Sequence, residues 1–373
     1  MPFILTTRLA AAQVTALPVS PSLFIPTPGT PFATEAVEFN MRPSYVMQYN
    51  LNIQRQVTNN TVLTVAYVGS RGVNLFGQGD VNTAIPQIVN GVEFFPVGST
   101  RRNPAFDTIR KQIQGFNSWY NALNIGIVRR FSQDLQFQAS YTFGKSLDER
   151  SGTSGRQEFG NGQARTFDPY NRSLDKARSD FDVRHSFVAN LTYDLPFGRT
   201  SKGWVKQLIG NYQINTIVTM YSGAPFSVFV DGDPDRDATD DNAARPSLAT
   251  GVPLYPSQQT PNLWFNPAAF IAPVPGFRGS SPRNILTGPD YKSVDFSVVK
   301  EFPLSERRKI QFRAEVFNLF NRANFDLPSN ADDGEQVFTF SAPSTFTRID
   351  TAGRFFSTNG DSREIQFGLK FIF

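Results

Sequence analysis

The sequence predicts an all-β fold of antiparallel strands, and three features support this prediction. Apolar and polar residues alternate with a period of two in about nine segments, which gives each segment one apolar and one polar face. Short turns and long polar connections follow one another along the chain. No apolar run approaches the roughly 18 residues of a membrane-spanning helix. Together these features favour a transmembrane outer-membrane β-barrel with short periplasmic turns and long extracellular loops.

Composition agrees with a barrel but does not distinguish it from a soluble β-sandwich. Of the 373 residues, 18% are charged and 13% are aromatic, including 36 Phe. The mean hydropathy is nevertheless −0.29. Polar lumen residues and loops dilute the lipid-facing residues of a barrel in this way.

Residue counts exclude several functions. The net charge is +4 and Lys and Arg are scattered among acids, which does not favour nucleic-acid binding. The absence of cysteine excludes disulfides and thiolate chemistry. His185 is the only histidine, which excludes a histidine-based metal cluster. The sequence has no G-x-S-x-G motif, and Gly77-Gln78-Gly79 lacks the third glycine of a phosphate-binding loop. We therefore expect no enzyme, no catalytic residue and no cofactor.

Residues 1–42 are rich in Pro, Thr and Ala and show neither period. We expect an irregular segment here, an extracellular loop of a truncated barrel, followed by the barrel over 43–373. The stretch from Met1 to Arg8 lacks a basic start and a sufficient apolar run, so it makes a poor secretion signal. For an exported protein this indicates a fragment or a misplaced start.

The expected strands are grouped by connections of very different lengths. Polar connections of about 35 to 60 residues would be unusual inside a compact soluble domain, but they have a place outside a barrel. The longest, at about 230–290, carries many of the prolines. Polar turn residues such as Thr58-Asn59-Asn60 separate the paired strands. The strands are expected at 45–54, 63–67, 119–131, 135–145, 187–195, 212–223, 293–302, 309–320 and 364–373.

The last strand is the most informative. Ile365, Phe367, Leu369, Phe371 and Phe373 alternate with mostly polar residues, and the sequence ends on an aromatic ring. This ending resembles the assembly signal of bacterial outer-membrane barrels, so outer-membrane lipid and the barrel-assembly machinery are expected partners. A core strand that happens to come last is the alternative.

The strand count is odd, whereas bacterial single-chain barrels have an even number. We therefore expect the C-terminal part of a larger barrel, unless a further strand lies in 1–42 or 336–350.

Several segments in the right order resemble one family. They include Pro43-Ser44-Tyr45, Val65–Gly72, Ser179–His185 and Phe312–Asn321, and the similarity extends over about 40–373. These segments are similar to the barrel of Oar-like TonB-dependent receptors, large proteins common in Acidobacteria that carry an N-terminal carboxypeptidase-regulatory-like domain.

The resemblance implies a function and a cellular location. Family members are 22-stranded-type barrels in the Gram-negative outer membrane, plugged by an N-terminal domain and energised through a TonB box. This sequence holds neither plug nor TonB box, so the expected role is that of a barrel segment whose parent takes up an unknown solute and reaches TonB through the missing plug. A structural or adhesive surface barrel, a passive pore and a soluble all-β binding module are the alternatives.

One loop carries a candidate metal site. Asp231, Asp233, Asp235 and Asp237 alternate as the oxygen ligands of a calcium loop do. However, the glycine stands at Gly232 rather than at the sixth loop position, and no glutamate stands at the twelfth. A solvated extracellular loop and a weak divalent-cation site are both compatible with this pattern.

Overall fold

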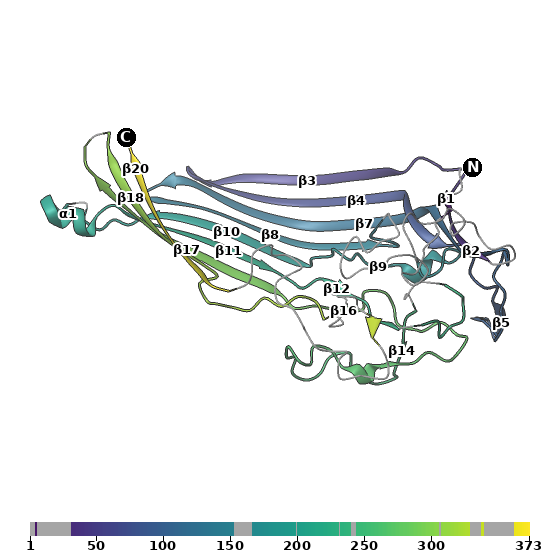
Figure 1. Ribbon diagram of the computed structural model, residues 1–373. Helices are drawn as coiled ribbons and strands as arrows, with labels where there is room; N and C mark the ends of the chain where they lie inside the picture. The colour runs from purple at the N-terminus through teal and green to yellow at the C-terminus, as the bar shows by residue number, and fades with distance from the viewer. Residues whose placement is uncertain are drawn as a thin grey trace, which may run out of the picture.

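The computed structural model of the chain describes residues 4–5, 31–152, 166–198, 200–230, 232–239, 244–305, 307–328, 337–338 and 362–373. The largest sheet contains nine long antiparallel strands that lie side by side in chain order. Figure 1 shows this sheet as a curved wall, with long connections at one end and α1 and the C-terminus at the other. Its strands are β3 (Tyr45–Thr58), β4 (Thr61–Asp80), β7 (Phe106–Ser132), β8 (Leu135–Asp148), β10 (His185–Asp194), β11 (Tyr212–Tyr221), β17 (Tyr291–Pro303), β18 (Lys309–Phe317) and β20 (Glu364–Ile372).

One face of the sheet is apolar from strand to strand. The register places Ile53 beside Val65, Val65 beside Ile125, Ile125 beside Tyr141 and Tyr141 beside Phe187. Ile53 and Val65 are exposed. An exposed apolar belt of this width is suited to lipid rather than to water.

The belt continues to the C-terminal edge. Val298 lies beside Ala314, which lies beside Phe367, and Phe367 is 68% exposed. The amphipathic closing strand that the sequence predicts is therefore present as β20, paired with β18.

The opposite face of the sheet is polar. The Thr192 hydroxyl donates to Asn215 Oδ1 over 2.9 Å, and Asn215 Nδ2 donates to Ser297 Oγ over 3.3 Å. The same row continues through Glu315 to Gln366 in the register. A polar face opposite a lipid-facing belt is what lines the lumen of a barrel.

Short turns join the strands at the end where α1 (Gly203–Ile209) lies. In the turn between β7 and β8, Gln133 and Asp134 have φ angles of 50° and 66°. Two successive residues in the left-handed region match the twist of an antiparallel hairpin. The predicted alternation of short turns and long connections is confirmed. No helix in the part of the chain that the structure describes is long and apolar enough to cross a membrane.

The structure differs from the expectation in two regions, the ends of β4 and β7 and the segment before β3. β4 and β7 have 20 and 27 residues, and they stay paired beyond the predicted strands, to Asp80 beside Arg110. In this extension β7 also pairs in parallel with β2 (Phe32–Val37), inside the segment expected to be irregular, and β2 pairs with β1 (Ile4–Leu5). Apart from Phe76, the residues that extend β4 are buried or half-buried, so apolar and polar residues need not alternate there as they do against lipid.

The long connections fold together at the other end of the sheet into what we call the loop lobe, the described residues of 81–105, 149–184 and 222–290 (Figure 1). Within it, Phe226, Phe265 and Leu286 are fully buried in a common apolar cluster. The region expected to be irregular over 230–290 therefore has its own core. Its short elements are β5 (Gln87–Val89), β6 (Val92–Phe94), η3 (Arg172–Asp175), β9 (Ala177–Arg178), β12 (Pro225–Phe226), β13 (Phe229–Val230, paired with β19, Val337–Phe338), β14 (Ser247–Leu248), η4 (Pro267–Ala269), β15 (Phe270–Ile271) and β16 (Leu286–Thr287).

Candidate functional site

Buried arginines fasten the loop lobe to the sheet. Arg283 pairs with Asp148, the last residue of β8, and its Nη1 lies 3.0 Å from Asp180 Oδ1. All three side chains are at most 4% exposed. The Arg283 Nε also donates to the Asp175 carbonyl over 3.0 Å. Removing one member of such a buried set leaves the others as uncompensated charges, which makes the attachment of the lobe depend on it.

A second buried arginine joins two connections within the loop lobe. Arg245 Nη2 lies 2.7 Å from Asp175 Oδ1, and both side chains are 2% exposed. Burial lowers the pKa of Arg245 to about 10, so the guanidinium is still charged at neutral pH. The Asp175 carboxylate also accepts from the Phe167 amide over 2.8 Å. The sequence gives no signal for these pairs because their members lie far apart along the chain.

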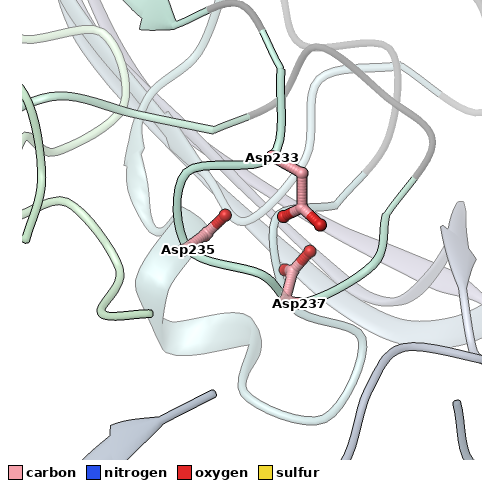
Figure 2. A group of neighbouring side chains, drawn as sticks. All are labelled: Asp233, Asp235 and Asp237. Carbon is pink, nitrogen blue, oxygen red and sulfur yellow. The ribbon is translucent and has the colours of Figure 1, made fainter. Parts of the chain in front are cut away.

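The candidate metal ligands that lie among the described residues come together in space. One carboxylate oxygen from each of Asp233, Asp235 and Asp237 lies within 4.8 Å of the others. Figure 2 shows the three side chains converging from one tight loop. Asp233 is exposed, whereas Asp235 and Asp237 are buried. The fourth candidate, Asp231, lies outside the described residues.

Two of these carboxylates have hydrogen-bond donors. Asp237 Oδ1 accepts from the amide and the hydroxyl of Thr239 over 2.9 and 2.8 Å. Asp233 Oδ2 accepts from the Ala238 amide over 3.1 Å. Burial raises the pKa of Asp235 to about 8, and the neighbouring charges of Asp237 and Asp233 act in the same direction. Three carboxylates this close repel one another, so the loop favours a bound positive charge.

Arg278 is the arginine that faces this cluster. Its Nη2 lies 3.6 Å from Asp237 Oδ2, while its Nη1 pairs with Asp168 and lies 3.1 Å from Glu93. One guanidinium group is thus paired with three carboxylates. The rings of Phe95 and Phe167 pack against it at 5.2 and 5.3 Å.

The other residues singled out from the sequence have structural surroundings. His185 begins β10, and its Nδ1 is 2.8 Å from the Tyr141 hydroxyl. Its ring also packs against Phe143 at 5.1 Å. Gly77 and Gly79 lie within β4. A Cβ at Gly77 would come within 2.6 Å of the Phe116 ring, so close packing explains that glycine.

Two cavities with charged and amide groups in their lining open near the sheet. One, of about 360 Å³, lies beside α1, and its lining includes Lys206, Asn211 and Glu301. The other, of about 260 Å³, has a lining that includes Asn215, Arg313 and Glu315. Arg313 Nη1 lies 3.5 Å from Glu315 Oε1 there. These side chains form a ladder of charged and amide groups, as expected for a lumen surface.

Comparison with known proteins identifies the class of this chain. A family model described as "Outer membrane beta barrel domain" matches residues 2–366. None of the curated proteins matches. Among solved structures, the outer membrane transporter YddB from Escherichia coli is similar with a TM-score of 0.45 and 7% identity, over 89% of this chain and 33% of that one. The chain thus spans about a third of the length of that transporter. Because the family model covers nearly all of its residues, the chain belongs to the outer membrane β-barrel domain family and is located in the outer membrane.

Proposed function

We propose that the chain is the barrel portion of an Oar-like TonB-dependent receptor, which takes up a solute across the outer membrane. The observation that supports this most directly is the combination of a polar lumen face with a folded loop lobe at one end of it. A lobe with its own core and buried ion pairs presents a fixed surface, which is suited to capturing a solute before it enters the lumen.

Two further observations support the receptor assignment over a small autonomous barrel. The segments that resemble Oar-like receptors, such as Ser179–His185 and Phe312–Asn321, follow in order along the chain. Among the described residues, β3 pairs only with β4 and β20 only with β18. Lipid leaves no partner for an unpaired sheet edge, so further strands are expected beside these two.

The proposed mechanism has the loop lobe bind the solute and a plug domain of the same receptor occlude the lumen until TonB acts on it. The barrel-assembly machinery would insert the protein through the strand that ends at Phe373. We further propose that the chain is not an enzyme, since its single histidine is engaged with Tyr141. An adhesive surface barrel and a passive pore are the competing functions.

The test uses the protein in native outer membranes, detected with an antibody against residues 364–373. We expect a heat-modifiable band that cross-links to TonB, with less cross-linking after a protonophore collapses the inner-membrane potential. A band that never cross-links to TonB and conducts ions steadily in planar bilayers would identify a passive pore. A band that does neither would favour the adhesive barrel.

A further inference from the structure

The loop at 232–239 places more negative charge in one place than the surrounding protein neutralises. Asp233, Asp235 and Asp237 present oxygens within 4.8 Å of one another. Arg278 is the cation paired with this set among the described residues, through Asp237 alone, and it also pairs with Asp168 and Glu93. One positive charge is therefore shared by two neighbouring carboxylates and three clustered ones.

Asp235 is the feature that points to a missing ligand. Its residue is 2% exposed, and within the described residues its carboxylate makes no ion pair and no hydrogen bond to another residue. Figure 2 shows the carboxylates of Asp233 and Asp237 pointing towards each other, with Asp235 beside them in the same loop, and one oxygen of each lies within 4.8 Å of the others. A buried carboxylate whose hydrogen bond comes from the amide of its own residue carries a large desolvation cost when it ionises. A cation bound between these oxygens offsets the cost directly.

The chemistry of the donors selects the cation. Carboxylate oxygens are hard ligands of the kind that calcium and magnesium prefer. Opposite ligands of calcium are about 4.6 to 5.2 Å apart and those of magnesium about 4.2 Å apart, from metal–oxygen distances of about 2.3 to 2.6 and 2.1 Å. The upper limit of 4.8 Å between the three oxygens admits either ion, but a single irregular loop does not impose the octahedron that magnesium demands, which favours calcium.

We propose that Asp233, Asp235 and Asp237 bind one calcium ion, which fixes the loop at 232–239 inside the lobe. The Asp237 carbonyl accepts from the Ala84 amide over 2.7 Å, and the Pro234 carbonyl accepts from the Gly276 amide over 3.0 Å. The loop is thus bonded to a second connection of the lobe, at Ala84, and to a distant part of its own connection, at Gly276. Calcium binding there orders all three segments together, whichever solute the protein handles.

The experiment is a calcium titration of the full chain, purified in detergent free of lipopolysaccharide and stripped with a chelator. We expect calorimetry to show one calcium per chain, and trypsin to cleave the loop lobe several times more slowly with calcium than without. Asp235→Asn should weaken calcium binding about tenfold or more, because the site loses a charged ligand. Asp107→Asn, which removes an exposed carboxylate paired with Arg101 in the same part of the molecule, is the matched control and should bind calcium normally.

Proteolysis of Asp235→Asn with and without calcium distinguishes a metal ligand from a carboxylate that only supports the fold. Without calcium, Asp235→Asn should be cleaved no faster than the native protein, because a carboxyl with a pKa of about 8 is already mostly neutral and an amide of the same shape replaces it. With calcium, only the native protein should be protected. Asp233→Asn, at the exposed member, provides the same comparison if the first variant does not fold. Calcium-independent cleavage of the native protein would overturn the proposal, and equal protection by magnesium would overturn the choice of ion.

Discussion

At the scale of single residues, Asp290 links acid stability to a defined ion pair. It precedes β17, pairs with Lys292, and lies 2.6 Å from Arg322 Nη2. Burial opposes its ionisation, but the hydrogen bonds and charges of Lys292 and Arg322 outweigh it and lower the pKa of Asp290. Because the pKa of Asp290 is lower in the folded protein than in the unfolded chain, its carboxylate stabilises the folded state fully at pH values above the unfolded pKa of about 3.9. This stabilisation is lost as the pH falls through the pKa of the folded protein.

The corresponding prediction concerns Asp290→Asn. The difference in unfolding free energy between native protein and variant should be constant above about pH 5 and should shrink below about pH 4. It should also be small, since the group is over a third exposed and solvent screens the pair. Urea titrations in detergent at several pH values measure it. A difference that grows on acidification would show that another group controls the acid response.

The sequence predicts the acidic residues of the candidate site but not their surroundings. Alternation of Asp233, Asp235 and Asp237 within one loop is enough to bring them together, because neighbours in a tight loop cannot separate far. The position of Arg278 depends instead on how several connections pack in the loop lobe. The burial of Asp235 also results from this packing, so the local sequence pattern does not predict it.

At the scale of elements, the membrane makes the strands predictable. Lipid on one face and lumen on the other require alternation over the whole crossing, so the nine strands agree with the sequence pattern. The residues that extend β4 are mostly buried or half-buried, so the alternation that lipid requires is not needed there, and the sequence pattern does not reveal this extension. The short strand β2 is fixed by pairing with β7 rather than by a pattern of its own.

The closing strand tests which face meets lipid. Phe367 of β20 lies on the apolar belt, and Gln366 beside it faces Glu315 on the polar side. Phe367→Lys should destabilise the barrel by about 2 to 4 kcal/mol, the cost of a lysine at the bilayer midplane. Gln366→Lys should be tolerated, since the new charge faces a carboxylate.

The heat-modifiable fraction in outer membranes measures both variants. We expect it to fall sharply for Phe367→Lys and to match the native level for Gln366→Lys. If the two variants assembled equally well, the assignment of the faces of β20 would be wrong.

At the scale of the whole molecule, the loop lobe is attached through a small number of buried charges. Arg283→Ala should leave Asp148 and Asp180 buried without their cation, which costs about 3 to 5 kcal/mol. The loss is confined to the lobe because the spanning strands keep their own pairing. Arg313→Ala, which breaks a pair between half-exposed side chains, should cost about 1 kcal/mol or less.

Limited proteolysis distinguishes these two outcomes. Arg283→Ala should be cut readily within 149–184 and 222–290, while the fragments that contain the strands stay protected in the membrane. Arg313→Ala should give the native pattern. Native resistance of the Arg283 variant would mean that the apolar cluster around Phe226 suffices to hold the lobe.

The length of β7 determines how far from the membrane the loop lobe lies. Twenty-seven residues at about 3.3 Å each give a contour of about 90 Å, and a tilt of about 45° converts this to a rise of about 60 Å. The apolar band of an outer-membrane barrel is only about 25 Å tall. Because the turn after β7 lies at the opposite end of the sheet, the part of β7 beyond the apolar band extends outwards from the membrane together with the loop lobe. A molecule that approaches from outside therefore contacts the loop lobe first, tens of ångströms from the nearest lipid tail.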